Sequence, residues 1–160
     1  MSYSYTVSIS NKPEKEKAMQ AQNSSILSHV SVGTANYDEA IAFYDKVMQT
    51  LDIPRIFHEP EFQATAYGRQ FPEFWVQAPH DGGAPSVGNG YHVAFLAESR
   101  EAVDAFYNVA IAAGAKDDGE PGTRPQYSEA YYACFVRDLD GHKIEAMYWD
   151  ESIAPMEGSH

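Results

Sequence analysis

Two histidines and one glutamate are the residues of this 160-residue chain that could do metal chemistry. His29 and His92 each open a strand-like apolar run, 63 positions apart (92 minus 29), and Glu145 lies inside another such run. A carboxylate is costly to bury unless it is paired or bound to a metal. Two imidazoles and one carboxylate make up the facial triads that hold a divalent metal with open coordination positions. All three are therefore candidate metal ligands, and the plainer alternative is two core histidines and a solvent-facing glutamate.

The 63-residue spacing recurs in the segments that follow the two histidines. His29–Val32, followed by Ala42–Tyr44, recurs as His92–Phe95, followed by Ala105–Tyr107. A repeat of this length is one supersecondary unit that must stack on its copy to bury its apolar face. The two histidines therefore occupy equivalent places and face the same pseudo-symmetric junction.

The first copy of the repeat is predicted to form a strand, a helix and three further strands. The apolar run at 26–32 predicts a strand, which Gly33 ends. Asn36 is a helix cap with Glu39 in the capping-box position, and Pro54 prevents the helix from continuing. The apolar stripe of this helix comprises Ala40, Ile41, Phe43, Tyr44, Val47, Met48 and Leu51. Strands are then predicted at 55–58, 64–67 and 73–78.

The second copy repeats this order after a Gly- and Pro-rich connector at 79–90. A strand is predicted at 91–96, and Ser99 caps a helix that Gly114 ends. The glycines between 114 and 122 indicate turns, and Asp140-Gly141 is a hairpin turn signal. The remaining strands are predicted at 115–118, 130–136 and 143–148.

The charge of the chain excludes several classes of partner. Eleven lysines and arginines stand against 23 aspartates and glutamates, which gives a formal net charge of −12. Such a surface repels phosphate backbones and anionic lipid, so we expect neither a nucleic acid nor a membrane partner. No apolar run approaches the ~18 residues that span a bilayer, and the first 25 residues lack the apolar core of a secretion signal. A cytoplasmic location is the default expectation.

Three segments are predicted from the repeat and its flanks. Residues 1–25 form a leader, which is either a mobile tail or a strand added to a sheet edge or a neighbouring subunit. Residues 26–155 form a single domain, made of module 26–80 and module 89–150. Residues 156–160 form a tail.

The ordered motifs of residues 26 to 150 resemble the vicinal oxygen chelate superfamily, the group of glyoxalases, bleomycin-resistance proteins and extradiol dioxygenases. The most specific motif is Asp138–Glu145 (DLDGHKIE), which is similar to the family's Asp-Pro-Asp-Gly-x-x-Ile-Glu ending, with Leu139 where proline is usual. The resemblance implies an α+β fold, in which two paired βαβββ modules form a curled mixed sheet around a cleft. It also implies a small-molecule substrate and a homodimer, with the cleft closed within one chain or across a swapped dimer.

The resemblance also assigns metal positions, because the superfamily takes ligands from the first and last strands of each module. Carried over, these positions are His29, His92 and Glu145, with Trp75 at the fourth. Tryptophan cannot ligate a metal, and Gln77, two residues on, could substitute through its amide oxygen. The implied cofactor is a divalent ion: Fe, Mn, Zn, Ni or Co.

Trp75 stands where the family has a metal ligand, and this difference affects which reaction the resemblance implies. Family members of the lactoylglutathione lyase type use a carboxylate from each module, one of them as a general base. Here Glu145 is the one catalytic candidate that remains. Extradiol dioxygenases use two histidines and one glutamate around the metal, which is the surviving set. We therefore expect a metal-dependent lyase or dioxygenase that chelates vicinal oxygens of a small substrate.

Two other functions stay open at this point. One is a metal-free binding or resistance protein of the bleomycin-resistance type, which would hold a flat ligand between aromatic side chains. The other is a degenerate domain that serves only as a dimerisation scaffold. The candidate substrate-binding residues are Tyr67, Trp75, Gln77, Arg124, Tyr127 and Tyr132.

Overall fold

The computed structural model of the chain describes residues 26–154. The predicted leader at 1–25 and the tail at 156–160 lie outside the described residues. The first half contains β1 (Val30–Gly33), α2 (Tyr37–Gln49), β2 (Arg55–Glu59), a 3₁₀ turn η1 (Pro60–Phe62), β3 (Ala64–Tyr67) and β4 (Phe74–Gln77). The second half contains β5 (His92–Leu96), α3 (Arg100–Ala112), β6 (Lys116–Arg124), β7 (Ser128–Arg137) and β8 (Lys143–Trp149).

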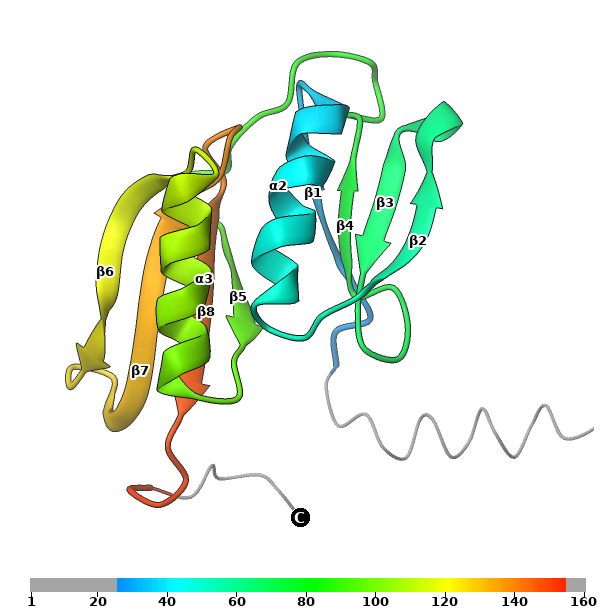
Figure 1. The fold of residues 1–160 in the computed structure, drawn as a ribbon. Helices are drawn as coiled ribbons and strands as arrows, with labels where there is room; N and C mark the ends of the chain where they lie inside the picture. Colours follow the sequence, from blue (N-terminus) through cyan, green and yellow to red (C-terminus); the bar gives the residue numbers. More distant parts are fainter. Residues whose placement is uncertain (1–25, 155–160) are drawn as a thin grey trace, which may run out of the picture.

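The strands form two four-stranded mixed sheets of the same topology (Figure 1). Their orders are β1-β4-β3-β2 and β5-β8-β7-β6. In each sheet the first strand runs parallel to the last, and the other pairings are antiparallel. The predicted α+β fold of two βαβββ modules is confirmed.

Both helices begin at the residues that the sequence predicts. The Asn36 side chain accepts a hydrogen bond from the backbone N–H of Glu39 at 3.4 Å, and Ser99 accepts one from Ala102 at 3.1 Å. Each cap satisfies a backbone donor that the helix itself leaves unpaired. All seven residues of the predicted stripe on the first helix are buried. Among residues 26–154 no helix is long and apolar enough to cross a membrane.

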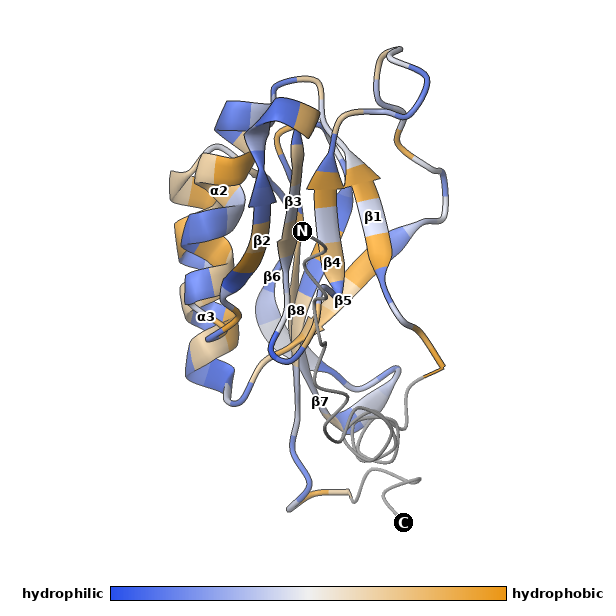
Figure 2. Ribbon diagram, turned by 90° about the vertical axis from the view of Figure 1, so that its right-hand side faces the viewer, coloured by the Kyte–Doolittle hydropathy of each residue, from blue (hydrophilic) through white to orange (hydrophobic). Residues whose placement is uncertain are grey.

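The helices α2 and α3 cover the same side of the two sheets (Figure 2). Their apolar faces and the inner strand faces form one core that spans both halves. Phe74 of β4 meets Phe95 of β5 edge to face at 5.0 Å between ring centroids, and Phe95 lies 6.3 Å from Phe106 of α3. Among the described residues, 26–154, no helix covers the other face of each sheet, so side chains that point there are available to form a site.

A buried polar cluster ties the turn between β7 and β8 to the first half of the chain. The Asp138 carboxylate accepts hydrogen bonds from the Tyr44 hydroxyl at 2.6 Å and from the His142 backbone N–H at 2.7 Å. The His142 Nε2 lies 2.7 Å from the Gly33 carbonyl oxygen, and because a carbonyl only accepts, Nε2 carries the proton. The sequence indicated no special role for His142, yet it is only 3% exposed. The motif that carried the family resemblance thus also holds the two halves together.

The segment after α3 differs from the prediction. A short strand at 115–118 followed by turns was expected, whereas β6 continues to Arg124 and pairs with β7. Register shifts between Asp117 and Gly119, and between Gly119 and Gly122, show that the glycines lie in bulges rather than turns. Gly119 has a φ of +150°, and a Cβ there would lie 3.1 Å from the Phe135 ring. Glycine therefore lets the bulged strand approach its neighbour closely.

Candidate functional site

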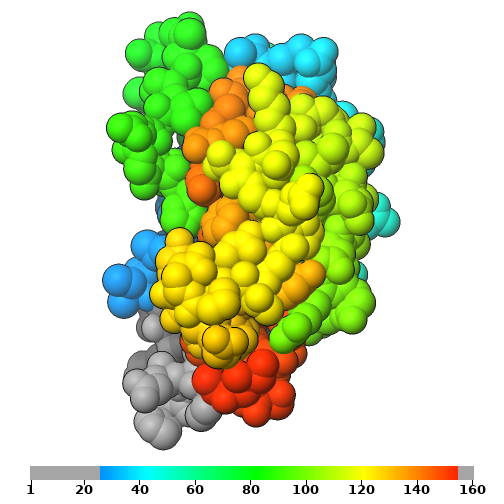
Figure 3. Space-filling view, turned by 90° about the vertical axis from the view of Figure 1, so that its left-hand side faces the viewer, coloured from blue at the N-terminus to red at the C-terminus, as the bar shows by residue number. Residues whose placement is uncertain are grey.

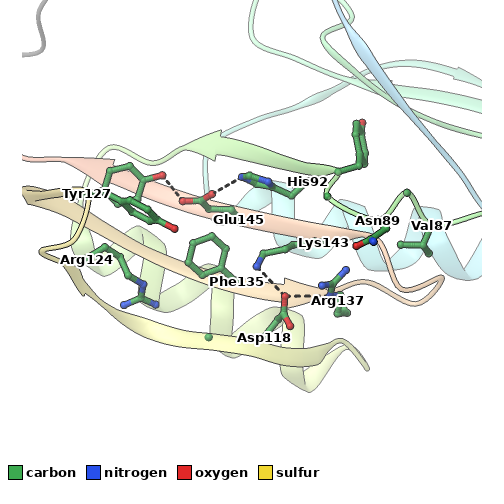
Figure 4. A pocket seen from close by; sticks show the side chains of 15 residues that line it. Val87, Asn89, His92, Asp118, Arg124, Tyr127, Phe135, Arg137, Lys143 and Glu145 are labelled. Carbon is green, nitrogen blue, oxygen red and sulfur yellow. Dashed lines mark hydrogen bonds and ion pairs between the residues drawn. The ribbon is translucent and has the colours of Figure 1, made fainter.

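Glu145 lies on the helix-free face of the second sheet, next to His92. It pairs with Ala94 of β5 and Phe135 of β7, so all three side chains share one face. His92 lies two residues before Ala94 and shares that face too. The Nε2 of His92 lies 3.3 Å from Oε2 of Glu145 (Figure 4).

The Glu145 carboxylate is buried and fully engaged. Its side chain is 2% exposed, whereas that of His92 is 47% exposed. The Tyr131 hydroxyl donates to Oε1 of Glu145 at 2.5 Å. Burial, together with this hydrogen bond, raises the pKa of Tyr131 well above its usual value. Tyr131 therefore keeps its proton at neutral pH and remains a donor to Glu145.

The His92–Glu145 pair has the spacing of two ligands on one metal ion. Two donor atoms that each lie ~2.1 Å from a divalent ion, at roughly 90–109°, are about 3.0–3.4 Å apart. The observed 3.3 Å falls in this range. Within residues 26–154, however, no group of three or more His, Cys, Asp or Glu side chains could hold a metal. The pair fits a metal, and one chain supplies only these two of the three predicted ligands.

His29 lies apart from that pair. It immediately precedes β1, is exposed, and lies with its Nδ1 3.1 Å from the Ser28 hydroxyl oxygen. Its ring meets Trp75 edge to face at 6.5 Å, and Trp75 in turn lies 5.1 Å from the Phe57 ring. The structure therefore brings His92 and Glu145 together and places His29 in an aromatic cluster on the first sheet.

The strand register puts Trp75 at the position equivalent to Glu145. Trp75 pairs with Ser31, and Glu145 pairs with Ala94, which is the residue 63 positions after Ser31. The first sheet thus presents an indole where the second presents a carboxylate. Gln77, two residues on, pairs with Gly33 near the far end of β4.

A cavity of about 970 Å³ opens above His92 and Glu145. Figure 3 views this side of the molecule, with the green segment before β5, the yellow β6 and, in orange, β7 and β8. Two predicted substrate-binding residues, Arg124 and Tyr127, line the cavity. Arg124 belongs to β6 rather than to a loop, and Tyr127 lies in the turn that follows.

Two other predicted contacts lie on the opposite sides of their strands. Tyr67 is 1% exposed and donates to Asp45 of α2 at 2.9 Å. Tyr132 donates to Asp104 of α3 at 2.8 Å. Neither lines the His92–Glu145 cavity. Tyr67 belongs to the first sheet, and Tyr132 points to the helix side of β7, where Tyr131 takes the cavity side instead.

Sequence reasoning assigned no role to several residues that line this cavity. They are Asn89, Asp118, Phe135 and Lys143. Lys143 lies two residues before Glu145, and side chains alternate along a strand, so the sequence does predict that Lys143 shares the face of Glu145. The bulged pairing of β6 that brings in Asp118 was not readable from the sequence.

A second cavity of about 600 Å³ lies between the edges of the two sheets. His29 and His92 both line it, together with residues of β5 and of the segment between β3 and β4. The two histidines therefore border one open space without forming a metal group among the described residues.

Comparisons with known proteins agree with this fold. Residues 26–146 match the Glyoxalase/Bleomycin resistance protein/Dioxygenase superfamily. The chain is also similar to a glyoxalase/bleomycin resistance protein from Albidiferax ferrireducens T118, with 32% identity and a TM-score of 0.67. That alignment covers 78% of this chain and 98% of the other. No curated protein sequence matches the chain.

More distant structures share the fold alone. A glyoxalase/bleomycin resistance protein/dioxygenase family enzyme from Burkholderia phytofirmans PsJN is 19% identical with a TM-score of 0.58, covering 76% of this chain and 97% of that one. The fosfomycin resistance protein FosX from Listeria monocytogenes is 18% identical with a TM-score of 0.56, covering 78% and 93%.

Proposed function

Because the chain belongs to the glyoxalase/bleomycin resistance protein/dioxygenase superfamily, we propose that it is a metal-dependent enzyme acting on a small molecule with two adjacent oxygens. The observation that carries this proposal is the His92–Glu145 pair, 3.3 Å apart at the floor of an open cavity. A carboxylate this buried is costly unless it is paired or metal-bound. The imidazole of His92 is half-exposed, so it offsets the cost of burying the Glu145 carboxylate only in part.

We assign the third ligand to His29 of a second copy of the chain. His29 is exposed and lies on the sheet face that has no helix, as the His92–Glu145 pair does on the other sheet. A homodimer that sets the first sheet of one copy over the second sheet of the other would complete the triad twice, by symmetry. The divalent metals to test are Fe, Mn, Zn, Ni and Co.

The residues of the site have separate roles in this proposal. A bound divalent ion would act as a Lewis acid toward the adjacent substrate oxygens and stabilise negative charge that develops on them. Glu145 is the catalytic residue, since it holds the ion and offers the carboxylate that exchanges a proton with the substrate. Tyr131 orients that carboxylate by its hydrogen bond at Oε1.

Metal analysis tests this proposal directly. Protein purified without chelators, or reloaded with each metal, is expected to hold about one ion per chain, as a site shared symmetrically by two copies requires. Glu145→Gln and His92→Ala should lose that ion, because each removes a ligand. His80→Ala is the matched control, since His80 is exposed in the connector before β5 and outside the cavity. A wild-type protein that neither retains nor gains any metal would contradict the proposal.

A metal-free binding protein is the second candidate, and the aromatic cluster favours it. Trp75 replaces a carboxylate at the equivalent strand position, and the Phe57 ring lies against it. Bleomycin is the ligand to titrate, since a similar structure carries bleomycin resistance in its name. In a metal-free binder Trp75→Ala should weaken binding and His29→Ala should leave it unchanged, as measured by calorimetry with a chelator present.

A further inference from the structure

The cavity above Glu145 concentrates positive charge in a chain that carries little of it. Three basic side chains (Arg124, Arg137 and Lys143) and two acidic ones (Asp118 and Glu145) line it. Over the whole chain, acidic residues outnumber basic ones by 23 to 11. A protein with this net charge repels anions at long range, so an anionic ligand needs a local excess of cations in order to bind.

One carboxylate is shared by two of these cations. Asp118 of β6 lies 3.1 Å from Nε of Arg137 and 3.1 Å from Nζ of Lys143 (Figure 4). One negative charge cannot balance two positive charges, so one positive charge remains on the cavity wall. Glu145 does not balance it, because its oxygens face Tyr131 and His92.

Lys143 stands next to the proposed metal ligands. It pairs directly with His92 in the β5–β8 register and precedes Glu145 by two residues on the same face, about 7 Å along the strand. Its Nζ lies 4.5 Å from the centroid of the Phe135 ring, and Cζ of Arg124 lies 5.5 Å from the same centroid. The Phe135 ring therefore lies between two cations, beside the proposed metal ligands.

We propose that the substrate is a small carboxylic acid whose carboxylate binds Lys143 and Arg137 while its flat body lies on Phe135. Its pair of adjacent oxygens then reaches His92 and Glu145, and this second half rests on the proposed function. The carboxylate competes with Asp118 for the ammonium and guanidinium donors. A monoanion matches the one positive charge that Asp118 leaves uncompensated on Lys143 and Arg137.

Benzoate and benzamide, which differ in charge but hardly in shape, test the anion site in metal-free, chelator-treated protein. Benzoate should bind more tightly than benzamide, as followed by NMR chemical-shift titration. Lys143→Gln should weaken benzoate binding about tenfold, the value of a charge-assisted hydrogen bond, and leave benzamide unchanged. Lys46→Gln, which removes an exposed lysine on α2, is the matched control. Equal binding of the two probes, or equal benzoate binding by the wild type and Lys143→Gln, would overturn the proposal.

Asp118→Asn supplies an independent test, because it removes the competing carboxylate and keeps the side-chain shape. Benzoate affinity should then rise by about threefold, since both cations become available to the ligand. An unchanged or lower affinity in the folded variant would contradict the competition. None of these titrations contains a metal, so a chain without a metal site could still give the expected benzoate binding. Conversely, if the benzoate tests fail, the proposed metal site is not refuted, because metal analysis tests it separately.

Discussion

Tyr131 illustrates how a neighbouring residue would orient a proposed metal ligand. Its hydroxyl occupies Oε1 of Glu145, which leaves Oε2 directed at His92. Groups that hydrogen-bond to a ligating carboxylate typically raise metal affinity 10–100-fold. This corresponds to roughly the free energy of one or two hydrogen bonds. The metal affinity of the proposed His92–Glu145 site would therefore depend on a third side chain, Tyr131.

We expect Tyr131→Phe to lower metal affinity about tenfold or more, because the carboxylate loses its orienting donor. Competition with a chromophoric chelator measures the change. Tyr132→Phe is the matched control: it removes the same hydroxyl from the neighbouring residue, which points to α3 instead. Equal losses in the two variants would show that the effect is one of folding and not of ligand orientation.

At the scale of elements, the β7–β8 turn is held to the first half of the chain by buried polar contacts. Asp138 is 5% exposed, and burial raises its pKa, while the hydrogen bond from Tyr44 opposes that rise. The folded state therefore binds a proton at Asp138 more readily than the unfolded chain does. Between the ordinary pKa near 3.9 and the raised value, this residue makes stability fall as the pH rises.

Tyr44→Phe should destabilise the fold by about 1–3 kcal/mol at pH 7, because it leaves a buried carboxylate without its hydroxyl donor. The loss should shrink as the pH falls through the raised pKa of Asp138, since the hydrogen bond favours the ionised carboxyl group. Urea unfolding at several pH values measures both effects. In an Asp138→Asn background the pH dependence of the Tyr44→Phe loss should vanish, and its persistence would refute this assignment.

At the scale of the whole molecule, the two halves present unequal faces. The second sheet carries the His92–Glu145 pair, and the first carries His29 beside Trp75 and Phe57. Within residues 26–154 of one chain, no group of three or more His, Cys, Asp or Glu side chains could hold a metal. Two copies related by a twofold axis would present each incomplete face with its complement.

Mixing two defective variants tests this dimer. His29→Ala and Glu145→Ala should each lose metal binding, yet their mixed dimer keeps one complete site. After random exchange of chains, about one quarter of all sites should regain metal, because half of the dimers are mixed and each has one intact site. Metal bound per chain after co-refolding measures the recovery. If no site is regained, the three ligands do not come from two copies.

Local patterns in the sequence were enough to predict the order of elements, the helix caps and the face of Glu145. They act within a few residues, through backbone capping and through the periods of helix and strand. The 63-residue repeat extended the prediction to the pairing of two alike halves, which the sheets confirm. The sequence did not predict the length of β6 or the burial of His142, because both depend on partners far along the chain.

The candidate site, too, could be predicted from the sequence only in part. The candidate residues were readable, since histidine and glutamate in apolar strands are unusual and the two histidines stand at equivalent places of the repeat. Which of them meet was decided by strand pairing. β5 and β8 are neighbours in the second sheet, which brings Glu145 to His92, whereas His29 lies beside Trp75 on the first sheet. Asp118 came to share Lys143 and Arg137 for the same reason, because cross-strand neighbours are set by register and bulges rather than by the sequence around each residue.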